Sequence, residues 1–575
     1  MDSFYSTFGP LIGPCTQPTL NSSGAHLMGR GYRIAPVSES SSPASPNRGR
    51  TPPDLPGVHE IGERLSIRLF EAGGGFRDLL GYLVSPTSIR KRDGSTVDFD
   101  PATIFVWKVV ASQEIKTRLA IFDTRSRSIL PITASNGRYV RIYSCGPTVY
   151  RDAHVGNLRT FLVSDLIIKI LRYTGVDSRL IQNITDVGHM SEDVNEDKLL
   201  AESIARKIDP YEIAREYESR FHRDLELLGV QPASVYPRAS ESIELMQNLI
   251  AELISKKHAY VGDDGSIYFD ARSFSGYGEI SGNRLDALKP GHRYEYSEDG
   301  AKRFHADWAL WKSAGNRTEM IWDSPWGRGF PGWHIECSAM SLHYLDGSVD
   351  LHLGGIDLRF PHHENERAQS NTAIEREVVS HWVHGEHLLF DGRKMSNSAG
   401  NVVLVSDLVR RGLDPLALRL TFLENRYRSQ IDLTWDALIA ADATIKRWRK
   451  KVKEWGEGAS TAEAEEKTAL LIAMICDDLR SADALIELRK IERDESLTPA
   501  TRAYVFRELD KIFSLDLDRE EESIRLSPEQ QQLLAERERA RADKNFEKSD
   551  ELRAQLRLLG VEVKDSPFGQ SFEIL

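Results

Sequence analysis

A strand, a glycine-containing loop, a helix and a second strand follow one another within residues 139–185, and this order constrains the fold most strongly. Residues 139–145, YVRIYSC, form an apolar run typical of a buried strand. Residues 158–175 repeat apolar side chains on one helical face and end at Gly175, which suits a C-cap. Residues 178–185 predict the next strand. The pattern predicts an α/β fold built on a doubly wound, Rossmann-type parallel sheet.

The remaining sequence divides by composition and hydrophobic pattern. Ser- and Pro-rich residues at the start bury little apolar area, whereas short alternating runs around Asp93-Gly94 predict hairpins. After about residue 402 the pattern is almost entirely helical. We expect a disordered tail at 1–56, a small β-barrel at 57–112, the Rossmann-type domain at 117–401 with an insertion at about 230–330, a helical bundle at 402–525, and a C-terminal module of two helices and a hairpin at 527–575.

Composition excludes several classes of protein. The net charge of −12 argues against a protein that coats nucleic acid through bulk charge, although a local basic surface stays possible. No stretch reaches the roughly 20 apolar residues that a membrane helix needs. The four cysteines are far apart, and the start of the chain lacks the pattern of a secretory signal. We therefore expect a cytoplasmic protein without disulfides or membrane contact.

The loop between the first strand and its helix carries His154, Gly156 and Asn157. Ligands of doubly wound sheets bind beyond the carboxyl ends of the strands. The helix N-terminus at this place offers free N–H groups and a positive dipole end, which suit a phosphate. Gly156 allows close approach, and the histidine can donate to phosphate oxygens. Taken alone, such a loop is more often a simple turn.

A second polar stretch, DGRKMSNSAGN at 391–401, follows an apolar strand. Its lysine, Lys394, suits a mobile cation that reaches phosphate groups. Taken alone, an exposed polar loop is the more common interpretation.

A third stretch, FPHHENERAQS at 360–370, places His362 and Glu366 four residues apart, so a helix presents both on one face. This spacing is a plausible half-site for zinc, and Cys145 and Cys337 could supply two thiolates. Each cysteine alone is more often a small buried apolar residue. Their positions favour the metal, because Cys145 ends a predicted strand and Cys337 opens a predicted helix at the same sheet end.

These stretches together resemble the motifs of class I aminoacyl-tRNA synthetases, specifically those of the cysteinyl-tRNA synthetase family. The resemblance runs from about residue 119 to 575 and rests on five segments in the family's order: CGPTVYRDAHVGNLRTF, NITDVGH, SPWGRGFPGWHIECSAMS, DLHLGGIDLRFPHHENERAQS and KMSNSAGN. It implies a monomeric enzyme that activates L-cysteine with ATP and Mg²⁺ and transfers cysteine to tRNA(Cys). It also implies that the helical bundle contacts tRNA and that residues 527–575 lie near the anticodon.

The resemblance further implies the role of each site residue. One Zn²⁺ per chain would be held by Cys145, Cys337, His362 and Glu366. Thr148 and Trp333 would border the amino-acid pocket, and His154, Asn157 and Lys394 would be catalytic. The ATP and adenylate would contact His154, Gly156, Asn157, His352, Gly354, Gly355, Asp357, Lys394, Ser396 and Ser398.

The sequence departs from the family at several points. Asn397 replaces the second lysine of Lys-Met-Ser-Lys-Ser, Leu353 stands where glycine is common, and Phe330 stands where arginine is common. Residues 1–116 have no counterpart in the usual enzyme. Two alternatives therefore stay open: a ligase that joins cysteine to an amino sugar, and a tRNA-binding or cysteine-sensing paralogue with weak catalysis.

Overall fold

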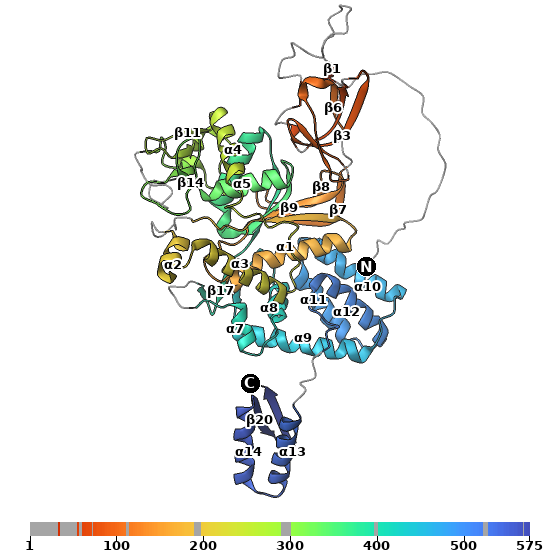
Figure 1. Cartoon of the computed structure of the whole chain (residues 1–575). Helices are drawn as coiled ribbons and strands as arrows, with labels where there is room; N and C mark the ends of the chain where they lie inside the picture. The colour runs from red at the N-terminus through yellow and green to blue at the C-terminus, as the bar shows by residue number, and fades with distance from the viewer. Residues whose placement is uncertain are drawn as a thin grey trace, which may run out of the picture.

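The computed structural model describes residues 33–34, 55–56, 60–61, 63–71, 73–91, 93–110, 114–188, 197–288, 301–395, 401–520, 527–566 and 569–574. A four-stranded parallel sheet, of which Figure 1 labels β9, has the strand order β10-β9-β15-β16. The strands are β9 (Tyr139–Ser144), β10 (Asp177–Gln182), β15 (Val349–Gly355) and β16 (Val379–Gly385). The predicted parallel sheet and the βαβ unit at 139–185 are confirmed.

Helices cover both faces of this sheet. α1 (Val155–Tyr173) packs on one face, where Ile142, Leu351 and Val383 share a core with it. α5 (Trp333–Tyr344) and α6 (His362–Ile374) pack on the other face, against Tyr143 and Trp382. Successive strand residues therefore point to opposite layers, as in a sheet buried on both sides.

Two smaller antiparallel sheets border the central one. The hairpin of β7 (Ile115–Asp123) and β8 (Ser128–Ala134) joins β16 through the Thr124 N–H, which donates to the Trp382 carbonyl at 2.8 Å. An insertion carries the sheet β11-β12-β13-β14. Its strands are β11 (Ala259–Val261), β12 (Ile267–Phe269), β13 (Trp308–Ser313) and β14 (Gly329–Pro331), preceded by α2 (Lys198–Arg206), α3 (Pro210–Leu227) and α4 (Ile243–Ser255).

The second half of the chain is mainly helical. A three-stranded sheet of β17 (Leu388–Phe390), β18 (Arg393–Lys394) and β19 (Ile431–Leu433) leads into it. Its helices are α7 (Val405–Arg410), α8 (Leu416–Leu423), α9 (Trp435–Trp455), α10 (Ala462–Cys476), α11 (Ser481–Arg493) and α12 (Pro499–Phe513). Helices α8 to α12 share the apolar core of α1. Figure 1 shows these helices grouped on the same side of α1.

The C-terminal module consists of two helices and a hairpin, as the pattern at 527–575 predicts. They are α13 (Pro528–Ala542), α14 (Phe546–Leu558), β20 (Val561–Ser566) and β21 (Gly569–Ile574). Leu534, Leu556, Val561 and Val563 form its small core. None of the helices that the structure describes is long and apolar enough to cross a membrane.

The N-terminal region forms one antiparallel sheet in the order β1-β6-β2-β3-β4-β5 (Figure 1). Its strands are β1 (Arg33–Ile34), β2 (Arg64–Phe70), β3 (Phe76–Ser85), β4 (Ser88–Arg90), β5 (Thr96–Asp98) and β6 (Ile104–Val109). The predicted barrel is not confirmed, because no pairing among the described residues joins β1 to β5. Gly94 does form the expected turn, with φ of 87°. Apart from 33–34 and 55–56, the predicted tail lies outside the described residues.

A buried ionic network ties α1 to the helical half. Asp165 of α1 accepts hydrogen bonds from Arg419 at 2.5 Å and from the Gln231 N–H at 2.9 Å, and lies 2.7 Å from Lys169 Nζ. Arg419 also donates to the Phe513 carbonyl. Asp165 is 1% exposed, so its carboxylate balances two buried cations. Burial lowers the pKa of Lys169 to about 8, with the Arg419 charge acting in the same direction.

We predict that Asp165→Asn lowers the free energy of unfolding by about 3–5 kcal/mol, because it leaves Arg419 and Lys169 buried without their carboxylate. Urea unfolding followed by tryptophan fluorescence measures the change. Asp286→Asn is the matched control, since Asp286 pairs with Arg284 at an exposed position and surface pairs contribute little. Equal midpoints for the two variants would contradict a structural role for the buried network.

Candidate functional site

The start of α1 is closed by a reciprocal side-chain cap. His154 is the N-cap, and its Nδ1 accepts from the Asn157 N–H at 3.2 Å. The Asn157 Oδ1 in turn accepts a hydrogen bond from the His154 N–H at 3.3 Å. This reciprocal cap fixes both side chains at the N-terminus of the helix.

The histidine cap also has a defined protonation state. Burial, and secondarily the charge of Arg151, lowers the pKa of His154 to about 4, so the imidazole is neutral near pH 7. Because Nδ1 accepts a hydrogen bond, the proton resides on Nε2. His154 can therefore donate one hydrogen bond to an oxygen ligand in front of the helix.

The Lys394 segment lies directly over this turn. The Val155 N–H donates to the Val403 carbonyl at 3.0 Å. A Cβ at Gly156 would lie 2.9 Å from the Met395 Cε and 3.0 Å from the His154 ring, so one of these side chains would have to shift to admit it. The segment that carries Lys394 therefore lies against the capped start of α1, and the Lys394 side chain itself is exposed. Ser396, Asn397 and Ser398 lie outside the described residues.

Two thiols meet at the carboxyl end of the sheet. Cys145 follows β9, and its N–H donates to the Leu353 carbonyl of β15 at 3.2 Å. Cys337 comes from α5, and its Sγ is 3.9 Å from that of Cys145. Both are buried, at 6% and 1% exposure. The sequence-based expectation that these cysteines share one sheet end agrees with this geometry.

Helix α6 adds an imidazole and a carboxylate to the thiols. His362 Nε2 is 3.0 Å from Glu366 Oε1, as the four-residue spacing on a helix predicts, and Cys145 Sγ is 3.7 Å from the same oxygen. The donor atoms of Cys145, Cys337, His362 and Glu366 all lie within 4.8 Å of one another. His362 Nε2 is buried, and apart from this ion pair with Glu366 it has no hydrogen-bond partner in the described part of the chain. This donor set fits a tetrahedral zinc ion.

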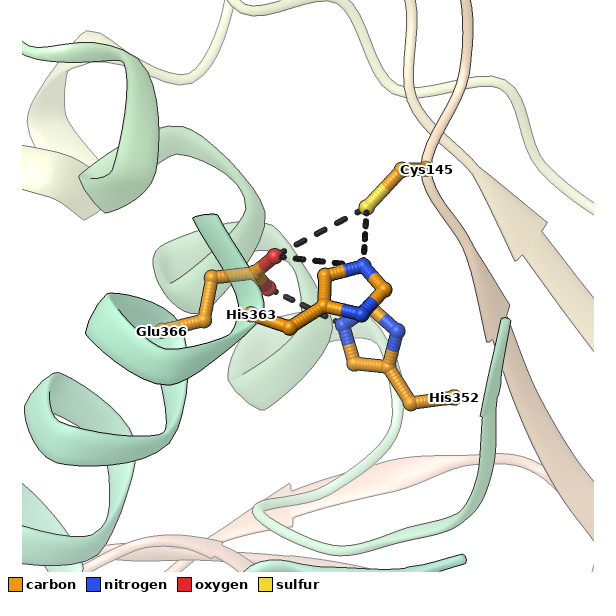
Figure 2. A group of neighbouring side chains, drawn as sticks. All are labelled: Cys145, His352, His363 and Glu366. Carbon is orange, nitrogen blue, oxygen red and sulfur yellow. Dashed lines mark hydrogen bonds and ion pairs between the residues drawn. The ribbon is translucent and has the colours of Figure 1, made fainter. Parts of the chain in front are cut away.

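A second set of donors overlaps the first. Cys145, His352, His363 and Glu366 also converge within 4.8 Å (Figure 2). His352 Nε2 lies 2.9 Å from Glu366 Oε2, and Cys145 Sγ lies 3.4 Å from His363 Nε2. Since the sets share Cys145 and Glu366, they describe one position rather than two. The first set supplies two thiolates, which zinc prefers, and leaves His352 to orient the carboxylate.

The charges of this cluster depend on one another. Burial by itself raises the pKa of Glu366, but His352 and His362 outweigh it and hold that pKa well below its usual range. Burial opposes the charged form of His362 as well, yet Glu366 and Cys337 raise its pKa to about 10. Burial raises the pKa of Cys145 well above its usual value. The site therefore keeps a carboxylate ionised in the protein interior.

Three further histidines support the cluster and were not singled out from the sequence. His334 Nδ1 lies 2.8 Å from His362 Nδ1, which directs Nε2 of His362 toward Glu366. His363 Nδ1 lies 2.8 Å from His384 Nε2, and His384 Nδ1 contacts Thr124 at 2.8 Å. The adjacent pair His362-His363 is a signal that the sequence displays, whereas nothing local links His384 to it.

The expected amino-acid and adenylate residues surround the same sheet end. Trp333 begins α5, and its ring centroid is 4.3 Å from that of His362. Thr148 forms a bridge to Thr185 in the loop after β9.

The other expected adenylate residues divide into two groups. Gly354 and Gly355 end β15, and Asp357 follows in a short 3-10 helix. The side chain of His352 points instead into the buried cluster (Figure 2), so a contact with adenylate stays a prediction.

Comparison with known proteins places this geometry in a family. Residues 131–443 match the model described as "tRNA synthetases class I (C) catalytic domain", and residues 525–572 match "Cysteinyl-tRNA ligase anticodon binding domain".

Curated relatives align over most of the chain. A cysteine–tRNA ligase of Thermus thermophilus is 40% identical over 79% of this chain and 99% of its own. One from Treponema denticola is 36% identical over 74% and 93%, and cysteine–tRNA ligase 1 of Burkholderia lata is 40% identical over 79% and 96%. With this similarity, the chain belongs to the cysteinyl-tRNA synthetase family of class I aminoacyl-tRNA synthetases.

Proposed function

We propose that this protein activates L-cysteine with ATP and transfers the cysteinyl group to the 3′ end of tRNA(Cys). The observation that carries the proposal is the meeting of two unlike sites at one sheet end. The capped start of α1 suits phosphates, and the Cys145 cluster suits a metal. Relatives named cysteine–tRNA ligases align with this chain over nearly their full length, and this similarity supports the same reaction.

The α1 side performs the ATP half of the reaction. In the first step the cysteine carboxylate attacks the α-phosphate, which forms cysteinyl-adenylate and releases pyrophosphate. The His154 Nε2–H donates to a phosphate oxygen, and the positive dipole end of α1 adds its partial charge. Lys394 neutralises developing charge on the leaving pyrophosphate, and Mg²⁺ would supply further positive charge when bound with ATP.

The cluster recognises the amino acid. Cys145, Cys337, His362 and Glu366 would hold one zinc ion. When bound, the ion offers a thiolate-selective coordination position, which favours cysteine over serine. Recognition by direct bonding discriminates by about 10⁴-fold or more, whereas a pocket that senses one methylene reaches roughly 10–200-fold. Trp333 packs beside His362 and borders the space for the substrate.

The two alternatives that the sequence leaves open are not favoured. An amine ligase has no use for an anticodon-binding module, and residues 525–572 match such a module. A non-catalytic paralogue need not keep two thiols, an imidazole and a carboxylate within 4.8 Å of one another. Cysteine-dependent pyrophosphate exchange followed by tRNA charging tests the proposal directly. The proposal would be refuted if the protein supports cysteine-dependent pyrophosphate exchange but transfers cysteine to an amino sugar instead of to tRNA.

We predict that Cys337→Ser reduces bound zinc from one equivalent per chain to less than about a tenth, because the substitution removes one of the two thiolates among four protein ligands. Elemental analysis after purification without chelators measures this. Cys476→Ser is the matched control, since Cys476 is also buried but belongs to α10, away from the cluster. Retention of zinc by Cys337→Ser together with its loss from His363→Gln would assign the second donor set instead.

We further predict that deletion of 527–575 leaves cysteine-dependent pyrophosphate exchange nearly intact and reduces tRNA charging by about 10–100-fold, since each good base contact contributes roughly 1–3 kcal/mol. The module has its own small core, so its removal exposes little of the remaining protein. Aminoacylation of tRNA(Cys) transcripts over a salt series is the measurement. A deletion that slows both reactions equally would place the module's role in catalysis or folding rather than in tRNA recognition.

A further inference from the structure

Arg159 is a buried arginine of α1 that the proposed chemistry does not use. It lies five residues after His154, and its side chain is 2% exposed. Its Nη1 donates to the carbonyls of Glu386 at 2.6 Å and His387 at 3.1 Å. Its Nη2 donates to the carbonyls of Arg426 at 3.0 Å, Tyr427 at 3.1 Å and Ser429 at 2.8 Å. One guanidinium therefore contacts five backbone carbonyls.

The five carbonyls belong to two segments that are far apart in the sequence. Residues 386–387 immediately precede β17, and residues 426–429 precede its parallel partner β19. The segments also bind each other, because the Glu386 N–H donates to the Tyr427 carbonyl at 2.9 Å. Arg159 thus holds the starts of both strands against α1.

The chemistry of this contact is specific to arginine. All the hydrogen bonds that Arg159 makes in the described part of the chain go to neutral carbonyls. Burial lowers its pKa to about 10, so the guanidinium stays charged near pH 7. A lysine carries three donors on one atom and cannot span carbonyls of two segments with a planar fork.

Lys394 lies on the hairpin that begins beside Arg159. We call the contact of Arg159 with the five carbonyls the clamp. β17 pairs with β18, and Leu389 of β17 is opposite Lys394 of β18. The same α1 carries His154 and Asn157 at its start. Two contacts near the helix start repeat the connection: the Val155 N–H to the Val403 carbonyl, and Met395 over Gly156. The position of Lys394 relative to the phosphate turn therefore depends on the attachment of β17 to α1.

We propose that Arg159 is a positioning residue that fixes the Lys394 hairpin at the correct distance from the phosphate-binding start of α1. The inference rests on the proposed function, since it concerns adenylate formation. Arg159 is too deeply buried to touch a substrate, so it acts through Lys394. A misplacement of about 1 Å at a reacting centre can slow a reaction by about 100-fold.

The first test is steady-state pyrophosphate exchange with Arg159→Lys. We expect kcat to fall by about 10–100-fold, while KM for cysteine and the zinc content stay unchanged, because the Cys145 cluster is held by other contacts. Exchange by Arg159→Ala should recover partly when millimolar guanidinium is added, since the free cation can occupy the emptied site. A variant that keeps the kcat of the unmodified protein would overturn the proposal.

Arg419→Lys provides the matched control. Arg419 is also 2% exposed and also donates to backbone carbonyls, those of Phe513 and Leu228. It joins α8 to α12 and to Asp165 in the middle of α1, but none of its hydrogen bonds in the described part of the chain reaches the β17-β18 hairpin. We expect this variant to lose stability and keep its kcat at temperatures where it is folded. If both variants lose kcat in proportion to their unfolded fractions, Arg159 has a structural role alone and the proposal fails.

Hydrogen exchange of the unmodified protein tests the clamp even if the variants do not fold. The amides of Glu386 and Ile431 donate to carbonyls that Arg159 also binds. They should exchange as slowly as the amides in the middle of α1, such as Ile167. Exchange at the rate of exposed loops would overturn the proposal. If the unmodified protein shows no cysteine-dependent pyrophosphate exchange, the proposed function is refuted. The hydrogen-exchange rates of these two amides would still test separately whether Arg159 holds the two segments in place.

Discussion

The parallel pairing of β9 with β15 is the constraint on which the rest of the site depends. Tyr143 is opposite His352, and the Cys145 N–H continues the ladder to the Leu353 carbonyl. Side chains alternate across a strand, so a shift of one residue would turn Cys145 away from α5 and α6. The register therefore decides that the thiol meets Cys337 and that the following loop reaches the start of α1.

A buried carboxylate gives this geometry its chemical character. Glu366 is 2% exposed, and a lone charge there would be costly. His352 and His362 each approach one of its oxygens, so the cost is offset by two imidazoles. The same arrangement leaves Nε2 of His362 and two sulfur atoms facing one position. Ligand geometry and electrostatic balance thus have a common origin in the packing of α6 on β15.

Much of the fold and part of the site follow from local patterns. The α1 helix, the strands around it and the adjacency of His362 to Glu366 rest on periodicities of two and 3.6 residues, which a sequence displays directly. The N-terminal sheet shows what local patterns do not predict, because alternating runs indicate strands but not whether the two edge strands pair to close a barrel. The histidine chain from His363 through His384 to Thr124 shows it again, since helix, strand and hairpin meet there through packing.

Local sequence is enough to establish the α/β class, the order of the elements and the identity of the ligand-type residues, because these depend on composition and short-range spacing. Only the packed chain specifies which donors share one position, that His352 supports Glu366, and that Arg159 holds the strands leading to Lys394. The physical reason is that most of these contacts join segments far apart along the chain. Their distances depend on sheet register and helix packing, which no local pattern encodes.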